Sequence, residues 1–467
     1  MSDSNYDLIV IGGGSAGSAC AAEAIKCGHE RVALVNDGEL GGLCILRGCM
    51  PTKSMLHAVE PLLEARHADR FGLRFPPAEI DFGAIMERKR EQVARFQRAK
   101  IAGMQAGGYE IIDGRGRFVG PDAIEVGGRE LTAGAFLIST GSRTAVPPIR
   151  GLDQVGYLDS DSLMELESAP ASLLVLGAGA IGLEFATFFA ALGTEVTLVS
   201  RSPLIERGEE PDLSEQYRRV VERAGVRVEL GMGLEQTRRT ADGVEVIAIA
   251  PDGGERIFKA EQLLLAAGRV PDYRGLDLEA AQIELDRHGV LRLDEALRTT
   301  NPRVFAAGDA TGRDLILHTG NAEGRHVARN LRCHSKGEEL VPWEEATPVR
   351  AIFTHPPYAQ AGFTAREAAA RGHTVISAQK NLANQGRGIV MGVYPDEGFV
   401  KLMADRGSGR IVGCQMLGPR ADDLVHVVST AMHLGGTVDD LIAMPWYHPT
   451  LSEVFIELAR ELRAQMI

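Results

Sequence analysis

The stretch Asp7-Leu8-Ile9-Val10-Ile11-Gly12-Gly13-Gly14-Ser15-Ala16-Gly17 indicates the fold of the first part of this 467-residue chain. A short apolar run of this kind is typical of a buried parallel strand. The glycine-rich turn that follows has the pattern G-x-G-x-x-G, and a helical stretch continues from it through Cys27. Glycines at these places let backbone amides approach a pyrophosphate at the helix N-terminus. We therefore predict a dinucleotide-binding unit in which Gly12, Gly14 and Gly17 contact the ligand.

The next strand of this unit is predicted over residues 31–35, and its end should carry a side chain that binds a ribose hydroxyl. An acidic residue is usual there, whereas this chain has Asn36 followed by Asp37. An amide can also hydrogen-bond a ribose. We expect the adenosine contact to come from Asn36 or Asp37.

A second unit of the same kind begins at the apolar run 173–176. Its fingerprint is Gly177-Ala178-Gly179-Ala180-Ile181-Gly182, in which Gly177, Gly179 and Gly182 are the predicted ligand contacts, and Glu184 follows shortly after. Two such units in one chain imply two dinucleotides, or one nucleotide exchanged against a resident cofactor.

The second strand of this later unit, predicted over 195–199, ends in Ser200-Arg201. An NAD site would have an acid at Ser200. Serine removes that negative charge, and an arginine can pair with a 2′-phosphate. The sequence favours NADP(H) over NAD(H), with an Arg201 that faces solvent as the alternative.

Composition narrows the class of protein. The chain has 50 basic and 63 acidic residues, a net charge of −13, which argues against general binding to nucleic acids or anionic membranes. The run 173–193 is rejected as a membrane span because it contains Glu184 and the second fingerprint. The start, residues 1–7, lacks a signal-peptide pattern, and six cysteines are too few for a disulfide scaffold. A cytoplasmic protein is expected.

The stretch Gly41-Gly42-Leu43-Cys44-Ile45-Leu46-Arg47-Gly48-Cys49-Met50-Pro51-Thr52-Lys53 carries the redox chemistry that we predict. Residues i and i+5 of a regular helix lie about 7.5 Å apart along its axis. A disulfide needs Cα atoms roughly 4.4–6.8 Å apart, so a bridge requires a distorted turn, which Gly48 can absorb. Such a small exposed bridge would be easily reduced. Two structural thiols, or half of a zinc site, are the alternatives, although no matching second pair is present and no metal site is expected.

This stretch, after an N-terminal dinucleotide fingerprint, resembles the redox motif of the pyridine nucleotide-disulfide oxidoreductases. That family includes dihydrolipoamide dehydrogenase, glutathione reductase and mercuric reductase, and the resemblance extends over essentially the whole chain. It implies that the first fingerprint binds FAD and the second NAD(P), and that Cys44 and Cys49 form a redox-active disulfide. It also implies that Lys53 and Glu184 form an ion pair beside the flavin. Further stretches resemble FAD-contact and crossover segments of the family: Thr140-Gly141, Gly268 and Gly308-Asp309.

The C-terminal part resembles the dimerisation domain of the family. The segment His448-Pro449-Thr450-Leu451-Ser452-Glu453 is similar to the family stretch in which a histidine is the acid-base residue and a glutamate orients it. The resemblance implies a homodimer in which His448 and Glu453 reach the disulfide of the other subunit.

The expected fold is α/β, with two Rossmann-like dinucleotide-binding domains and a C-terminal α+β dimerisation domain, as in glutathione reductase. The predicted division is 1–150 for the first FAD-binding part, 151–271 for the NAD(P) domain, 272–346 for the central part and 347–467 for dimerisation.

The resemblance favours dihydrolipoamide or a lipoyl protein as the dithiol partner, because of the histidine segment and of His318 with Glu323-Gly324. Mercuric reductases carry a tyrosine where this chain has His448, and a C-terminal cysteine pair, whereas this sequence finishes Ala464-Gln465-Met466-Ile467. Several residues depart from the family pattern: Leu43, Ile45-Leu46-Arg47, Trp446-Tyr447 and Ser200-Arg201. They leave open an NADPH-dependent reductase of another disulfide, or a flavoprotein subunit that mainly docks in a larger complex. Arg47 could lower a thiol pKa or face solvent.

Overall fold

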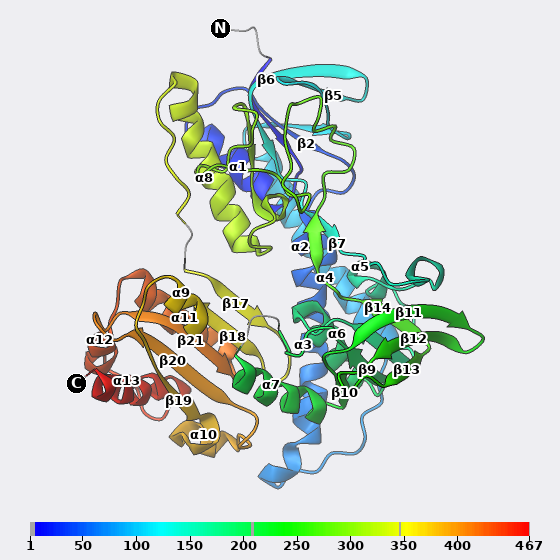
Figure 1. Cartoon of the computed structure of the whole chain (residues 1–467), viewed down its shortest axis with the longest axis vertical. Helices are drawn as coiled ribbons and strands as arrows, with labels where there is room; N and C mark the ends of the chain where they lie inside the picture. Colours follow the sequence, from blue (N-terminus) through cyan, green and yellow to red (C-terminus); the bar gives the residue numbers. More distant parts are fainter. Residues whose placement is uncertain (1–4, 207–209, 345–346, 467) are drawn as a thin grey trace. The chain divides into compact units, whose positions relative to one another are not determined.

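The computed structural model describes residues 5–206, 210–344 and 347–466. Three sequence expectations touch residues outside these ranges: the first four residues of the N-terminal segment, the predicted boundary at 346, and the final residue, 467. The described chain divides into two compact units, and the division falls within α3 and α4. The first unit is 1–54, 86–145 and 268–344, and the second is 55–85, 146–267 and 345–467. Figure 1 shows the elements of both.

The helices of the described residues have these bounds: α1 (Ser15–Lys26), α2 (Gly42–Arg47), α3 (Cys49–Arg66), α4 (Phe82–Gln105), α5 (Ser160–Leu163), α6 (Ala180–Ala191), α7 (Pro211–Arg223), α8 (Leu317–Lys336), α9 (Ala365–Ala370), α10 (Gly386–Met391), α11 (Ala421–His433), α12 (Val438–Ala443) and α13 (Val454–Gln465). Short 3₁₀ turns are η1 (Ala68–Phe71), η2 (Leu152–Gln154), η3 (Gly308–Thr311), η4 (Leu382–Asn384) and η5 (Leu451–Glu453). None of the described helices is both long enough and apolar enough to span a bilayer.

The first unit is built on a sheet in which β1 lies between β2 and β6. Its strands are β1 (Tyr6–Ile11), β2 (Val32–Asn36), β3 (Glu110–Asp113), β4 (Arg117–Gly120), β5 (Ala123–Val126), β6 (Arg129–Ile138) and β16 (Val304–Ala306). The pairs β1–β2, β1–β6, β2–β3 and β6–β16 are parallel, whereas β4, β5 and the start of β6 form an antiparallel meander. Parallel strands buried on both faces need continuous apolar runs, and residues 8–11 of β1 are fully buried.

Helices α1 and α8 pack side by side in this unit (Figure 1). Glycines make the close approach possible, because a Cβ on Gly324 of α8 would lie 2.3 Å from the carbonyl oxygen of Ala16. A Cβ on Gly320 would lie 2.9 Å from the Cα of Gly308, the first residue of η3. The small residues of α8 therefore bring η3 close to the first turn of α1.

The second unit contains a parallel sheet of the dinucleotide-binding type, in the order β10-β9-β8-β14. The chain between β10 and β14 forms a separate antiparallel sheet of three strands, in the order β11-β12-β13. The strands are β8 (Ser172–Leu176), β9 (Glu195–Val199), β10 (Val226–Glu229), β11 (Gly233–Thr240), β12 (Gly243–Ile249), β13 (Glu255–Ala260) and β14 (Gln262–Leu265). In the first unit, β7 (Ser142–Thr144) pairs with β15 (Arg269–Pro271) where the chain leaves and re-enters that unit.

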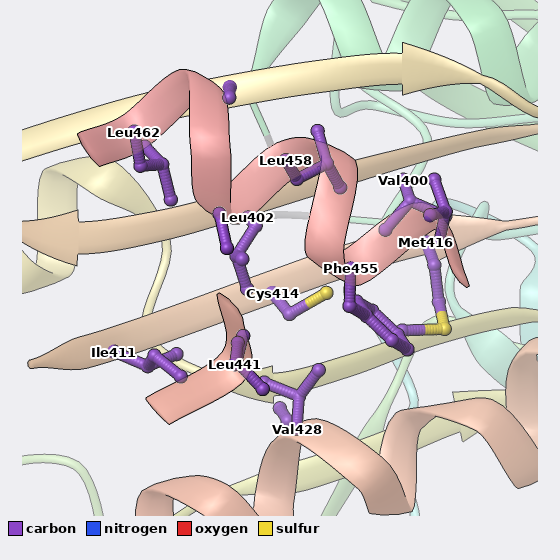
Figure 2. Close-up of a cluster of buried hydrophobic side chains, with 14 of the residues drawn as sticks. Val400, Leu402, Ile411, Cys414, Met416, Val428, Leu441, Phe455, Leu458 and Leu462 are labelled. Atoms are coloured by element: carbon purple, nitrogen blue, oxygen red, sulfur yellow. The ribbon is translucent and has the colours of Figure 1, made fainter. Parts of the chain in front are cut away.

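The C-terminal segment forms an antiparallel sheet in the order β17-β18-β21-β20-β19. Its strands are β17 (Val349–Ile352), β18 (Tyr358–Gly362), β19 (Val375–Asn381), β20 (Phe399–Asp405) and β21 (Ile411–Leu417). α11 packs on β18 and β21, and α13 packs on β19 and β20. Figure 2 shows the resulting core, where Phe455 and Leu458 of α13 meet Leu402, Cys414 and Met416 of the sheet. The predicted α/β fold with a C-terminal α+β part is confirmed.

Candidate active site

The two cysteines of the redox motif lie on either side of a break between two helices. Cys44 is in α2, and Cys49 is the first residue of α3. Gly48 separates them with φ −138° and ψ −117°, and a Cβ there would lie 2.9 Å from the carbonyl oxygen of Leu43. The helical path is therefore interrupted at the glycine that we expected to absorb the distortion.

Both cysteines are thiols in the structure, and their side chains are hydrogen-bonded to each other. This hydrogen bond, followed by burial, raises the pKa of Cys44, while the ammonium of Lys53 acts in the opposite direction. Cys44 is half-buried and Cys49 is exposed. The pair is close enough for thiol chemistry, and the redox disulfide between them stays a prediction. Burial raises the pKa of the thiols of Cys20 and Cys414, which fits inert positions.

The first fingerprint has the backbone that a pyrophosphate site requires. Gly12 has φ +113°, and a Cβ there would lie 2.3 Å from the carbonyl oxygen of Ser139. A Cβ on Gly17 would lie 2.0 Å from the carbonyl oxygen of Gly12, whereas a Cβ on Gly14 would lie 4.0 Å from the Cα of Gly42. Gly14 is the N-cap of α1, no side chain caps it, and no acidic residue lies in the first turn. The N–H groups of that turn can therefore receive an anion.

Asn36 ends β2 as predicted, but its amide is engaged within the protein. Its Oδ1 accepts from the N–H of Gly13 at 3.0 Å, and its Nδ2 donates to the carbonyl of Gly38 at 2.8 Å. Asp37 forms an ion pair with Arg115, with 3.0 Å between Oδ2 and Nε. Asn36 thus holds the fingerprint loop, and the ribose contact that we assigned to Asn36 or Asp37 stays a prediction.

The remaining FAD-type segments meet at the end of β6. The hydroxyl of Thr140 is buried and has no hydrogen-bond partner in the structure, and Gly141 has φ +76°. The hydroxyl of Ser142 donates to Asp309, and Arg269 donates to the Ser142 hydroxyl at 2.8 Å. A cofactor bound at the first fingerprint would give the buried hydroxyl of Thr140 a hydrogen-bond partner. These residues fit FAD.

Glu323 in α8 is part of this region, which its resemblance to a family stretch indicated. Its side chain is 1% exposed, and its Oε2 accepts from the N–H of Gly308 at 2.6 Å. Burial raises the pKa of Glu323 to about 7. Glu323 therefore fixes the start of η3, next to Asp309, while His318 lies exposed in the first turn of the same helix.

The second fingerprint repeats the geometry of the first. Gly177 has φ +127°, and a Cβ there would lie 2.2 Å from the carbonyl oxygen of Ala266. A Cβ on Gly182 would lie 2.1 Å from the carbonyl oxygen of Gly177, and Gly179 is the N-cap of α6. These residues fit a second dinucleotide, in agreement with the sequence.

A carboxylate that the sequence analysis missed lies at the N-terminus of α6. Glu206 accepts a hydrogen bond from the N–H of Ala180, and a Cβ on Gly179 would lie 3.8 Å from its Oε2. Burial raises the pKa of Glu206, and its Oε2 is buried with no partner in the structure. A pyrophosphate bound at the N-terminus of α6 would have to displace the carboxylate of Glu206.

The side chains predicted to select the nicotinamide cofactor follow β9. Ser200 is buried and its hydroxyl accepts from the N–H of Ser202 at 3.2 Å, while Arg201 is exposed. Glu184 in α6 is 4% exposed and accepts from the N–H of Phe353 at 3.0 Å. Lys53 belongs to the first unit and Glu184 to the second, and their ion pair stays a prediction.

The histidine segment forms a well-defined dyad. Nδ1 of His448 lies 3.0 Å from Oε1 of Glu453, and the N–H of Thr450 donates to Oε2 at 2.8 Å. The hydrogen bond from Thr450, then that from His448, lowers the pKa of Glu453. The His448 side chain is 78% exposed, whereas that of Glu453 is 19% exposed. A charged carboxylate is therefore held in place, and the imidazole that it orients is accessible.

The chain matches models of one protein family over most of its length. Residues 6–330 match the pyridine nucleotide-disulphide oxidoreductase family, and residues 349–459 match the dimerisation domain of the same family. Mercuric reductase of Streptomyces lividans is 36% identical over 96% of this chain and 94% of its own. Dihydrolipoyl dehydrogenase 2 of Haloarcula marismortui is 32% identical over 99% of this chain and 97% of its own.

A solved structure with a similar fold is the HOCl-induced flavoprotein disulfide reductase RclA from Escherichia coli. Its Cu(II) complex superposes with a TM-score of 0.83 at 27% identity, covering 98% of this chain and 99% of that one. These similarities agree with FAD and NAD(P) as cofactors. They do not separate the mercuric reductases from the dihydrolipoyl dehydrogenases, which our sequence analysis favoured.

Proposed function

Because this chain belongs to the pyridine nucleotide-disulphide oxidoreductase family, we propose that it passes electrons between a dithiol, dihydrolipoamide or a lipoyl protein, and NAD(P). The route is the Cys44–Cys49 pair and FAD. FAD, when bound, would exchange an electron pair with the Cys44–Cys49 pair on one side and with the nicotinamide on the other. Gly12, Gly14, Gly17 and Thr140 would hold it.

His448 and Glu453 supply the proton transfer in this proposal. In this role Nδ1 donates its hydrogen bond to Glu453, so that Nε2 of the exposed imidazole carries the lone pair. That nitrogen can take the proton of an incoming substrate thiol, and the carboxylate stabilises the imidazolium that results. We propose that the dyad acts on the cysteine pair of the partner subunit in a homodimer, which the matched dimerisation domain supports.

Cys44 and Cys49 carry out the exchange. A substrate thiolate attacks Sγ of Cys44, the Cys44–Cys49 bond breaks, and Cys49 leaves as a thiolate. The second substrate thiolate attacks the substrate sulfur of the mixed disulfide and releases Cys44. The substrate is oxidised to a disulfide, and two electrons remain on the cysteine pair.

The observation that carries the proposal is the His448–Glu453 dyad at 3.0 Å in a chain that also has a hydrogen-bonded cysteine pair. A lipoyl substrate is a thiol that must lose protons near neutral pH, which is the task of such a dyad. The dihydrolipoyl dehydrogenases among the relatives support the same substrate class.

Reduction of a metal ion or of another disulfide is the second candidate. The mercuric reductases among the relatives and the Cu(II) complex of the similar reductase favour it. In that case electrons run from NADPH through the cysteine pair to Hg(II), Cu(II) or a disulfide. If the protein only docks in a larger complex, turnover should be negligible with the lipoyl substrate, with Hg(II), with Cu(II) and with other disulfides.

The test compares turnover rates of the purified flavoprotein with dihydrolipoamide plus NAD⁺ or NADP⁺, and with NADPH plus Hg(II), Cu(II) or lipoamide. Fast turnover with the lipoyl substrate supports the proposal, and its loss in Cys44→Ser, with FAD still bound, assigns it to the cysteine pair. Fast turnover only with a metal ion, or none with any acceptor, contradicts the lipoyl assignment.

A further inference from the structure

A lysine that no part of the mechanism above uses lies partly buried near the redox motif. Lys100 is in α4, and its Nζ donates to the hydroxyl of Ser18 at 2.6 Å. Ser18 is 5% exposed and belongs to the first turn of α1. Burial lowers the pKa of Lys100, and attraction to Cys44 opposes that shift. Burying an ammonium has a cost, so a charge partner at this place is significant.

The face of α4 that carries Lys100 also contacts the segment that precedes Cys44. Gln97 precedes Lys100 by about one helical turn, and its Nε2 donates to the carbonyl of Leu40 at 3.1 Å. Two residues later, a Cβ on Gly42 would lie 2.6 Å from the Cα of Gly14. The redox segment is therefore held between α4 and the start of α1.

The hydroxyl of Ser18 links Lys100 to the start of α1. It accepts from Lys100 and donates to the carbonyl of Gly14 at 2.8 Å. Lys100 is thus fixed on the element against which Gly42 packs, in the first unit, which also contains Cys44. Cys49 and Lys53 act on the pKa of Cys44, and Cys44 in turn raises the pKa of Lys100.

We propose that Lys100 is a positioning residue whose ammonium stabilises negative charge on Sγ of Cys44. The inference rests on the proposed function, in which Cys44 exchanges with substrate. When the reduced protein acts on a disulfide, the Cys44 thiolate attacks one sulfur of RS–SR, forming Cys44–S–SR and releasing RS⁻, which takes up a proton. The Cys49 thiolate then attacks Sγ of Cys44, restoring the Cys44–Cys49 bond and releasing the second RS⁻.

A thiolate is the attacking species, so a fixed cation raises its population near neutral pH. In the opposite direction the same cation favours departure of Cys44 from the mixed disulfide. Lys53 already acts on Cys44 from α3, so removing Lys100 should weaken the thiolate without abolishing it.

The experiment measures alkylation of Cys44 by iodoacetamide, read by mass spectrometry of the peptide that contains it, from about pH 6 to about pH 10. The flavoprotein carries Cys49→Ser, so that Cys44 cannot form the disulfide. Lys100→Gln removes the charge and keeps an N–H donor for Ser18, Lys100→Met is the second uncharged variant, and Lys100→Arg restores the charge. Arg98→Met, at an exposed position of the same helix, is the matched control.

We expect Lys100→Gln to raise the pKa of Cys44 by about one unit, which lowers the alkylation rate near pH 7 about tenfold. Lys100→Arg and Arg98→Met should retain the parental profile. An unchanged profile in Lys100→Gln or Lys100→Met overturns the inference, as does an equal loss in Lys100→Arg. Alkylation needs no nicotinamide or disulfide substrate, so a wrong substrate assignment leaves this result unaffected.

Discussion

Oε1 of Glu453 lies 3.0 Å from Nδ1 of His448, while Oε2 of the same carboxylate accepts from the backbone N–H of Thr450 at 2.8 Å. The backbone therefore fixes the glutamate independently of the histidine. An orientation held in this way fixes which imidazole nitrogen is available for proton transfer.

Replacing this carboxylate should impair proton transfer without disturbing the fold. We expect Glu453→Gln to lower kcat about 100-fold, because the imidazolium loses its stabilising charge. Steady-state turnover with the best substrate of the parent protein measures the loss. Glu457→Gln, in the first turn of α13, is the control and should retain parental kcat. Parental kcat in Glu453→Gln contradicts the acid-base role of the dyad.

Arg201 should contribute to the choice of nicotinamide cofactor. It is exposed after β9 and follows a serine where NAD sites carry an acid. We expect Arg201→Ala to raise KM for NADPH about tenfold and to leave KM for NADH unchanged, since only the former has a 2′-phosphate to pair. Arg219→Ala, at an exposed position of α7, is the control. A parent protein that strongly prefers NADH contradicts this prediction.

Glu206 should compete with the pyrophosphate of the second nucleotide. Its carboxylate takes the hydrogen bond of Ala180 at the start of α6, where a phosphate would bind. We expect Glu206→Gln to lower the Kd for NADP⁺ by about three- to tenfold, because a repulsive negative charge is removed. Isothermal titration calorimetry on the oxidised protein gives Kd. Glu215→Gln, exposed on α7, should leave it unchanged, and weaker binding in Glu206→Gln contradicts the prediction.

Glu323 makes the stability of the protein depend on pH. Burial raises its pKa from 4.5 to about 7, so the unfolded chain releases this proton at lower pH than the folded protein does. Stability relative to Glu323→Gln should fall as pH rises from about 4.5 to about 7, by up to about 3 kcal/mol. Urea unfolding of both proteins at the two ends of this range measures it. Glu338→Gln, at an exposed position, should show no such trend, and a parallel pH dependence of parent and Glu323→Gln contradicts the assignment.

Much of the fold was predictable because it rests on local patterns. The apolar run at 173–176 and the predicted strand 195–199 correspond to β8 and β9. Glycines identify the two fingerprints because no other residue tolerates the approach of Gly17 or Gly182 to the neighbouring carbonyl. Such requirements are visible in a single sequence.

The rest of the site depends on contacts between distant parts of the chain. Lys100 and Gln97 belong to no sequence motif, and only the packing of α4 brings them to Ser18 and Leu40. Glu206 follows an irregular segment that carries no motif, so nothing in the sequence indicated its contact with Ala180. Sequence patterns identify the residues that bind a cofactor more readily than those that adjust its surroundings.

Electron transfer from a lipoyl dithiol through Cys44 and Cys49 is tested most directly by an anaerobic titration of the oxidised flavoprotein with dihydrolipoamide, followed in the flavin absorption spectrum. We expect a long-wavelength band of thiolate-to-flavin charge transfer from Cys49, followed by rapid reduction of added NADP⁺ or NAD⁺. The same band in Cys44→Ser before any reductant is added would agree with Cys49 as the thiolate beside the flavin. A band with NADPH and none with dihydrolipoamide would contradict the lipoyl substrate, and no band with either reductant would contradict the Cys44–Cys49 relay itself.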